Sequence, residues 1–242
     1  MINGTQVRYW IGKSGDCVLD TAVASKLVPT RFPVGWHLEF DLQRFLGPAV
    51  NVIVDGGANV GNTALRFARF FNEATIHAFE PIGATFNRLE ESIRNCPRIV
   101  CKQLALGETE AELSITLSGD SELNSLVNQT VSSCNSERVR VISLNQYAQS
   151  CGLETIDVLK LDLEGYELHA LRGADLLLNQ RSIRAVYAEC GFDKTDPCKT
   201  AFGALHEFLT GNDFRFSGLY QTFRWGSNKR WAGFSNGLWL HH

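Results

Sequence analysis

The 242-residue sequence lacks several features that would place a protein in a specialised class. None of its seven cysteines stands in a C-x-x-C pair, which disfavours a structural zinc site. No stretch approaches the roughly 18 apolar residues that a membrane-spanning helix needs. The first residues, polar from Asn3 to Gln6, do not resemble a secretory signal. We therefore expect reduced cysteines, a cytoplasmic location and no membrane partner.

The chain also carries little excess charge of either sign. It has 23 basic and 26 acidic side chains, with a formal net charge of −3. This balance does not favour electrostatic capture of nucleic acid. Hydrophobic residues make up 44% and charged residues 20%, which is typical of a globular protein with a substantial core.

Segments with strand and helix patterns alternate along most of the chain. Apolar, β-branched runs predict strands at residues 50–54, 75–79, 98–104, 111–117, 138–143, 156–161, 183–188, 214–220 and 235–240. Apolar residues at helical spacing predict helices at residues 62–71, 85–95, 165–178 and 199–209. Such alternation predicts a parallel α/β sheet that is covered by helices on both faces.

Two parts of the chain depart from this pattern. Residues 1–48 have mixed character, and we interpret them as an N-terminal extension or lid that packs on the core. Residues 49–242 then form a single domain. A polar segment at residues 118–137 is predicted to be a loop, and a loop this long in a compact domain is usually functional or flexible.

A glycine-rich turn, D-G-G-A-N-V-G at residues 55–61, follows the first strand of the alternating region. It is not a dinucleotide fingerprint, because Ala58 stands where G-x-G-x-x-G needs its second glycine. A P-loop is also excluded, because Val7 replaces the glycine required before Gly12-Lys13-Ser14. An acid at the strand end favours a cationic ligand. S-adenosylmethionine is such a ligand, since it carries a sulfonium and an ammonium group.

Glu80 ends the next predicted strand, 19 residues beyond Gly61. In open parallel sheets, an acid at this place accepts hydrogen bonds from ribose hydroxyls at the carboxyl edge of the strands. The turn and Glu80 together therefore predict a pocket for an adenosyl cofactor.

Three motifs together carry a resemblance to a known family. V-D-G-G-A-N-V-G, H-A-F-E-P and L-K-L-D-L-E-G-Y-E occur in this order, and the chain from about Val50 to Leu240 resembles the FkbM-type methyltransferases. The resemblance implies a Rossmann-like class I fold, with a seven-stranded, mostly parallel sheet whose last strand is antiparallel. It also implies an S-adenosylmethionine-dependent enzyme that methylates a hydroxyl of a small molecule, either a sugar or a secondary metabolite.

The resemblance further assigns residues to the cofactor. It implies that four residues of the glycine turn line the cofactor and that Glu80 holds the ribose. The four are Asp55, Gly57, Asn59 and Gly61. Ala105 and Leu106 belong to the segment expected near the adenine.

Acidic residues at two further strand ends are the candidates for catalysis. Asp162 is our first choice for a base or acceptor-positioning group, with Glu164 and Glu167 close behind, and Glu189 is placed to bind acceptor hydroxyls. Glu167 can instead be a partner of a helix dipole. His169 is a competing base, although it belongs to a different helix face. The acids could equally hold Mg²⁺, but we assign no metal.

Three rival functions share parts of this evidence. A base methyltransferase commonly has a D/N-P-P-Y/F/W signature where this chain has D-L-E-G at residues 162–165, so an N-methyltransferase or nucleic-acid methyltransferase is less favoured. A non-catalytic cofactor-binding protein and an NAD-dependent enzyme are further alternatives. The C-terminal aromatic and basic residues between Phe223 and Trp239 could stack on nucleic acid. We interpret them instead as a hairpin and a wall of the substrate pocket.

Overall fold

The computed structural model describes residues 9–11, 17–19, 33–116, 136–193 and 195–242, and its centre is a seven-stranded sheet in the order β11-β12-β10-β9-β3-β4-β5. Its strands are β3 (Val52–Gly56), β4 (Thr75–Phe79), β5 (Ile99–Lys102), β9 (Ile156–Leu161), β10 (Ile183–Gly191), β11 (Phe214–Trp225) and β12 (Trp231–His241). Strands β3, β4, β5, β9 and β10 are parallel, whereas β12 is antiparallel to both its neighbours. The predicted Rossmann-like fold is confirmed, including the antiparallel last strand.

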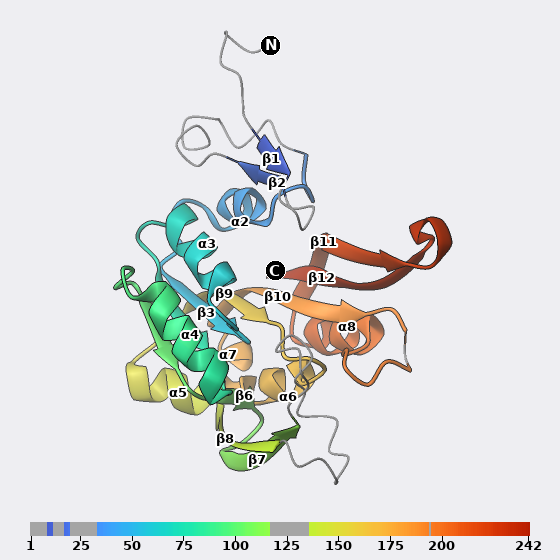
Figure 1. Ribbon diagram of the computed structural model, residues 1–242. Coiled ribbons are helices and arrows are strands. Elements are labelled where there is room, and N and C mark those ends of the chain that lie inside the picture. The colour runs from blue at the N-terminus through green and yellow to red at the C-terminus, as the bar shows by residue number, and fades with distance from the viewer. Residues whose placement is uncertain (1–8, 12–16, 20–32, 117–135, 194) are drawn as a thin grey trace.

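Helices cover both faces of this sheet (Figure 1). One face packs against α2 (Leu38–Leu46), α3 (Asn62–Phe70) and α4 (Gly83–Ile93). The other packs against α5 (Leu144–Cys151), α6 (Glu167–Arg172), α7 (Asp175–Asn179) and α8 (Phe202–Gly211). Successive residues of a strand point to opposite faces, so Ile53 belongs to the first core and Val54 to the second.

The prediction of one continuous helix at residues 165–178 is wrong, because the structure divides this segment into two helices, α6 and α7. The break lies at Gly173, where an added Cβ would lie 1.9 Å from the carbonyl oxygen of Gly107. Helix α5 was not predicted. It begins with a capping box, in which Ser143 accepts from the backbone N–H of Gln146 and the Gln146 side chain accepts from the backbone N–H of Ser143.

A second, three-stranded sheet lies beside the main one. It contains β6 (Ala105–Gly107), β7 (Ala111–Thr116) and β8 (Ser136–Ser143) in the order β6-β8-β7. The predicted loop at residues 118–137 lies outside the described residues except for Ser136 and Glu137, which begin β8.

Helix α2, which precedes β3, belongs to the core. Leu42 of α2 is fully buried and packs in the same cluster as Ile53. The Tyr220 hydroxyl donates to Asp41 at 2.8 Å, which joins α2 to β11. Strands β1 (Tyr9–Ile11) and β2 (Cys17–Leu19) pair antiparallel. Most of residues 1–32 lies outside the described part, so the lid remains a prediction.

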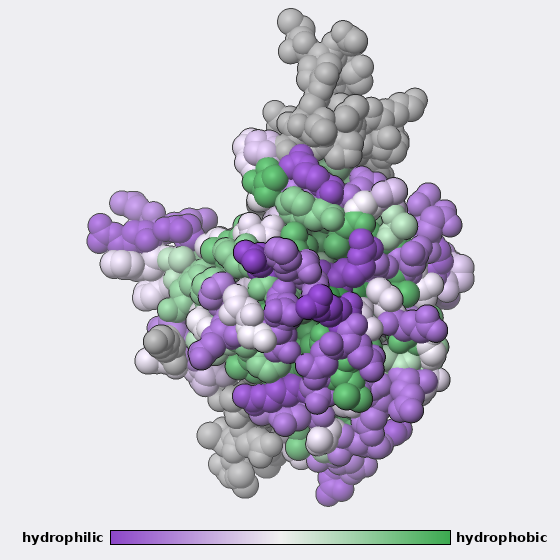
Figure 2. Space-filling model, turned by 180° about the vertical axis from the view of Figure 1, so that it is seen from behind, coloured by the Kyte–Doolittle hydropathy of each residue, from purple (hydrophilic) through white to green (hydrophobic). Residues whose placement is uncertain are grey.

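The C-terminal strands β11 and β12 form a long hairpin that projects from the body of the molecule (Figure 1). From behind, it stands out as a mainly hydrophilic arm (Figure 2). Among the described residues, no helix has the length and hydropathy needed to cross a membrane.

Candidate cofactor and acceptor site

The carboxyl ends of β3 and β9 meet where the strand order reverses. From β3 the sheet continues through β4 and β5, whereas β9 and β10 lie on its other side. Ligands of open α/β sheets bind at such a switch point. A cavity of about 390 Å³ opens there, within the size range of small-molecule sites. Its lining consists of Gly57, Asn59, Phe79, Glu80, Pro81, Ile82, Leu104, Ala105, Leu106, Ile115, Asp162, Leu163, Glu164, Glu189, Lys199 and Phe234.

The glycine turn forms the β3 side of this cavity. The backbone N–H groups of Gly57 and Ala58 both donate to the carbonyl of Phe79, at 3.0 and 2.8 Å, so the turn is tied to the end of β4. Gly57 has φ +72, and an added Cβ would lie 1.9 Å from the carbonyl oxygen of Asp162. Only glycine therefore allows β3 and β9 to approach so closely at the cavity edge.

Gly61 does not line the cavity, although the resemblance placed it at the cofactor. It is the N-cap of α3, with φ +90, and an added Cβ would lie 2.7 Å from Leu89 Cδ1 on α4. The lack of a side chain at Gly61 allows α3 and α4 to pack closely. Gly61 therefore acts on a ligand only indirectly.

Asp55 also lies behind the cavity. Its side chain is fully buried, and its Oδ1 lies 2.9 Å from Lys160 Nζ. The two residues are register partners on the adjacent parallel strands β3 and β9, so their side chains point to the same face of the sheet. In this structure the cationic partner of Asp55 is thus a lysine, and Asp55 is not among the residues that line the cavity.

Lys160 joins this ion pair to the glycine turn. Its ammonium donates to the carbonyls of Gly56 and Gly57, at 3.1 and 2.9 Å, and lies 3.8 Å from Asp162 Oδ2. Burial by itself would lower the pKa of Lys160, but the charges of Asp55 and Asp162 outweigh burial and raise it. The lysine is therefore a buried cation that holds the turn in place.

Glu80 faces the cavity from the end of β4, as predicted. Its Oε2 accepts from the backbone N–H of Asn59 at 3.1 Å, and its Oε1 accepts from that of Ile82 at 3.0 Å. Each oxygen retains a lone pair for a ligand hydroxyl. Burial raises the pKa of Glu80 to about 7, against the lowering effect of these two backbone hydrogen bonds and of the Lys160 charge.

Apolar residues complete this half of the cavity. Ala105 and Leu106 on β6, which the resemblance assigned to the adenine, line the cavity, and Phe79, Ile82 and Ile115 also line it. Apolar walls next to a carboxylate that can accept hydrogen bonds from a diol suit an adenosyl group.

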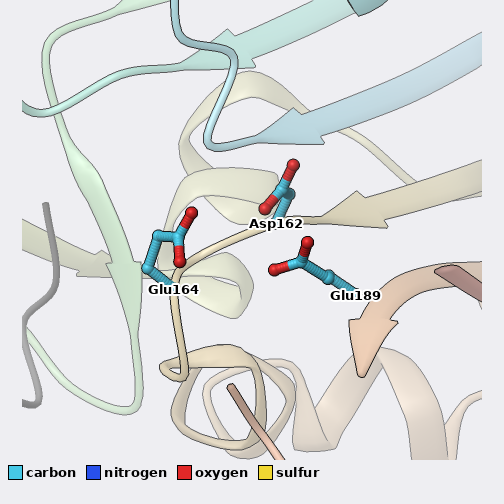
Figure 3. Close-up of side chains that lie close together, drawn as sticks. All are labelled: Asp162, Glu164 and Glu189. Carbon is cyan, nitrogen blue, oxygen red and sulfur yellow. The ribbon is translucent and has the colours of Figure 1, made fainter. Parts of the chain in front are cut away.

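The three predicted catalytic acids come together on the opposite side. Asp162 and Glu164 lie on the loop after β9, and Glu189 lies near the end of β10 (Figure 3). One carboxylate oxygen from each lies within 4.8 Å of the others. The Asp162 side chain is 39% exposed and that of Glu189 is 7% exposed. The three belong to segments far apart in sequence, and the parallel strands align them at one edge.

A lysine that the sequence reading did not select connects two of these acids. The Lys199 ammonium donates to Glu164 Oε2 at 2.6 Å and to Glu189 Oε2. Burial raises the pKa of Glu189 to about 8, with the Asp162 charge adding to this effect and Lys199 opposing it. Burial likewise raises the pKa of Glu164 to about 7, again against Lys199. Both carboxyls titrate near neutrality, where a general base is most effective.

Two other residues considered for catalysis do not line the cavity. Glu167 is 1% exposed, and its carboxylate accepts from the Leu163 N–H at 2.7 Å and from the Thr200 hydroxyl. His169 stacks on Tyr166 with ring centroids 4.3 Å apart. Glu167 therefore organises the loop that carries the acids, and His169 contacts Tyr166 outside the cavity.

Lys160 and Lys199 are two charged residues of the site that the sequence reading missed, whereas Phe234 lies in the segment predicted to form a wall of the substrate pocket and does line the cavity. A signal existed for Lys160, because a lysine within the apolar strand 156–161 needs a buried acid as its partner. Lys199 gave no such signal, since it lies outside the motifs and reaches the cavity through the pairing of Gly191 with Ala201.

Known proteins share parts of this chain. "Methyltransferase 1" of Beauveria bassiana is 29% identical over an alignment of 149 residues, and the match covers 53% of this chain and 60% of that protein. "Hexuronic acid methyltransferase AglP" of Haloferax volcanii is 27% identical over 150 residues, 62% of this chain and 60% of that protein. The chain thus spans about 60% of the length of these curated relatives.

A solved structure and a family model extend the comparison. The structure of the METTL16 MTase domain has a TM-score of 0.50 at 11% identity, covering 97% of this chain and 87% of that one, which shows a shared fold. The model of the methyltransferase FkbM domain matches residues 55–216, more than half of the chain and the whole distance from Asp55 to the start of β11. The chain therefore belongs to the FkbM methyltransferase domain family.

Proposed function

We propose that this chain is an S-adenosylmethionine-dependent O-methyltransferase whose acceptor is a hydroxyl group of a small molecule, a sugar or a secondary metabolite. One observation carries the proposal. A single cavity has the glycine turn and Glu80 on one side and the three acids with Lys199 on the other. No metal and no nucleic-acid partner is part of the proposal.

The charge of the cavity supports a cationic cofactor. Among the described residues that line or underlie it, five carboxyl groups stand against two ammonium groups. These are Asp55, Glu80, Asp162, Glu164 and Glu189 against Lys160 and Lys199. Such an excess of acids favours a ligand with a sulfonium and an ammonium and disfavours a polyphosphate. Glu80 would hold the ribose, and Ala105 and Leu106 would contact the adenine.

The acids give the chain the means to prepare an acceptor. When bound, S-adenosylmethionine supplies an electrophilic methyl group, which the acceptor oxygen takes while the carbon–sulfur electron pair passes to sulfur. Asp162, the most exposed of the three acids, orients the acceptor hydroxyl. Glu189, whose pKa is about 8, receives the hydroxyl proton as the oxygen is methylated.

A sugar acceptor has support from one relative. The Haloferax protein carries the name of a hexuronic acid methyltransferase, and its matched length includes more than half of this chain. Hydroxyl-rich acceptors suit a wall of carboxylates, because each carboxylate oxygen accepts hydrogen bonds.

Calorimetry with S-adenosylhomocysteine tests the cofactor half of the proposal. We expect a dissociation constant on the order of 10 µM, and binding of ATP and NAD at least about tenfold weaker. ATP and NAD are the controls. All three ligands contain adenosine, so a difference in affinity reports how the charge of the cavity acts on the rest of the ligand. Absence of heat with S-adenosylhomocysteine at millimolar concentration would refute the proposal.

Transfer of a labelled methyl group to a panel of hexoses, hexuronic acids and phenols tests the acceptor half. Glu189→Gln should lower kcat by on the order of 100-fold with an unchanged affinity for S-adenosylhomocysteine. If amines on the panel are methylated and hydroxyl compounds are not, the O-methyltransferase assignment is wrong and the N-methyltransferase alternative replaces it.

A further inference from the structure

Lys199 is held in the acid cluster by contacts on several sides. Its ammonium donates to Glu164 and to Glu189, and it lies 4.9 Å from the ring centroid of Phe234. Only 10% of the side chain is exposed. The cavity therefore holds an ammonium group between two of its acids.

Two glycines bring the Lys199 segment this close. An added Cβ on Gly191 would lie 2.8 Å from Lys199 Cβ, and one on Gly165 would lie 3.0 Å from the carbonyl oxygen of Pro197. The N–H of Gly191 also donates to the carbonyl of Thr200 at 2.8 Å. The backbone around Lys199 is thus packed on the ends of the two segments that carry the acids.

The same acids have the spacing of a divalent cation site. Oxygens of Asp162, Glu164 and Glu189 lie within 4.8 Å of one another (Figure 3). Mg²⁺ and Mn²⁺ favour oxygen ligands of this kind. Lys199 donates to two of the three, so its ammonium already lies between two carboxylates that would be ligands of such an ion.

We propose that Lys199 is a built-in cation that takes the place of a divalent metal ion among Asp162, Glu164 and Glu189 and positions Glu189 toward the acceptor. This inference rests on the proposed methyl transfer for its catalytic consequence, but the exclusion of metal depends only on the geometry of the chain. Lys199 is a positioning residue, because it acts through the two carboxylates it holds.

Manganese binding, followed by electron paramagnetic resonance of free Mn²⁺, tests the proposal without any methyl acceptor. The wild type should bind Mn²⁺ no more tightly than its Glu189→Gln variant does. Lys199→Ala removes the ammonium and leaves three carboxylates around a vacated space, so its affinity for Mn²⁺ should rise at least tenfold. Lys229→Ala, which removes an exposed lysine at the hairpin tip, is the matched control and should not change this affinity.

Two results would overturn the proposal. One is tight Mn²⁺ binding by the wild type that Glu189→Gln abolishes, since the metal and Lys199 would then coexist. The other is a Lys199→Ala protein that still binds S-adenosylhomocysteine, and so is folded, but gains no affinity for Mn²⁺. Should Lys199→Ala not fold, the same measurement on Lys199→Met, which keeps the length of the side chain, decides the question.

Turnover separates positioning from a structural role. The wild type should be equally active with EDTA and with added Mg²⁺, and Lys199→Ala should lose activity that millimolar Mn²⁺ partly restores. If Lys199 only packed the loop, Mn²⁺ would not restore the activity of Lys199→Ala. An inactive wild type with unchanged Mn²⁺ results would argue against the proposed reaction, and the assignment of Lys199 as the resident cation would stand.

Discussion

The two sides of the cavity are built in different ways. The β3–β4 side consists of the glycine turn, one carboxylate, Glu80, and apolar side chains such as Ala105 and Leu106. The β9–β10 side consists of charged side chains from residues 162 to 199 and an aromatic ring, Phe234, from the hairpin. A turn whose backbone faces the ligand suits a ligand that does not vary, whereas a wall of side chains can be changed to select a different acceptor. Lys160 connects the two sides, because it contacts both Asp55 and Asp162.

The largest effect on ligand affinity should follow a change to the backbone cradle. Gly57→Ala places a Cβ 1.9 Å from the Asp162 carbonyl, at a φ of +72, so β3 and β9 must separate at the cavity. We expect at least a 100-fold loss of affinity for S-adenosylhomocysteine and a loss of stability of more than about 2 kcal/mol. Gly203→Ala, where an added Cβ meets nothing within 4 Å, is the matched control in calorimetry and urea denaturation. Normal binding by Gly57→Ala would show that the cradle is not the cofactor site.

The largest effect on stability should follow a change to the connection between the two sides. Lys160→Met leaves Asp55 buried without its partner, and losing one member of a buried pair costs about 3–5 kcal/mol. The double variant Asp55→Asn/Lys160→Met should recover part of this loss in urea denaturation, because no buried charge is left unpaired.

An exposed ion pair provides the reference for this measurement. Arg181 and Asp213 lie 3.1 Å apart, with side chains 65% and 66% exposed. Arg181→Met should change the stability by no more than about 1 kcal/mol. If Lys160→Met and Arg181→Met lose the same amount of stability, the buried ion pair of Lys160 does not stabilise the fold more than an exposed ion pair does.

A smaller effect, with a defined pH dependence, should distinguish Glu80. Its pKa is raised to about 7 by burial, so the native state keeps this proton longer than the unfolded chain does. The contribution of Glu80 to stability therefore falls as the pH rises from about 4.5 to about 7. Relative to the wild type, Glu80→Gln should gain stability over this range.

Ligand binding should change in the opposite direction. The ionised carboxylate accepts from ribose hydroxyls, so the wild-type affinity for S-adenosylhomocysteine should increase as the pH passes 7, and Glu80→Gln should show no such increase. Calorimetry at pH 6 and pH 8 measures it. A wild type with the same affinity at both values would contradict the assignment of Glu80 to the ribose.

The smallest effect should come from the hairpin. Phe223 is 50% exposed and stacks on Phe234, which lines the cavity, with ring centroids 4.9 Å apart. Phe223→Ala should raise the acceptor KM about fivefold, which corresponds to about 1 kcal/mol, and leave the affinity for S-adenosylhomocysteine unchanged. Trp36→Ala, at an aromatic residue that is 69% exposed before α2, is the control in the same kinetics. If Phe223→Ala changes only the affinity for S-adenosylhomocysteine, the hairpin belongs to the cofactor side of the cavity and not to the acceptor side.

The cofactor side could be predicted from the sequence because its parts are neighbours in the chain. Strand β4 has the predicted bounds, and Gly57, Asn59 and Glu80 lie at the cavity where the motifs placed them. Asp55 shows the limit of this reading. An acid at a strand end indicates that a cation is near, but it does not say whether that cation is a ligand or, as here, Lys160 on the adjacent strand.

The acceptor side could be predicted only in part. Asp162, Glu164 and Glu189 were selected as strand-end acids, and the parallel sheet does bring them together. The break between α6 and α7 was missed, because the close approach of Gly173 to Gly107 is a contact between distant segments. The exclusion of Gly61 from the cavity has the same cause, since its close contact is with Leu89 on another helix.

By itself, the sequence determined the alternation of strands and helices, the glycine turn and the acids at the strand ends, because periodicity and local motifs record them directly. Only the tertiary structure decided which charges meet. The pairing of Asp55 with Lys160 depends on the register of β3 with β9, and that of Lys199 with Glu164 and Glu189 depends on a segment packed on two glycines. Buried charges find their partners through space, and distance along the chain does not encode that choice.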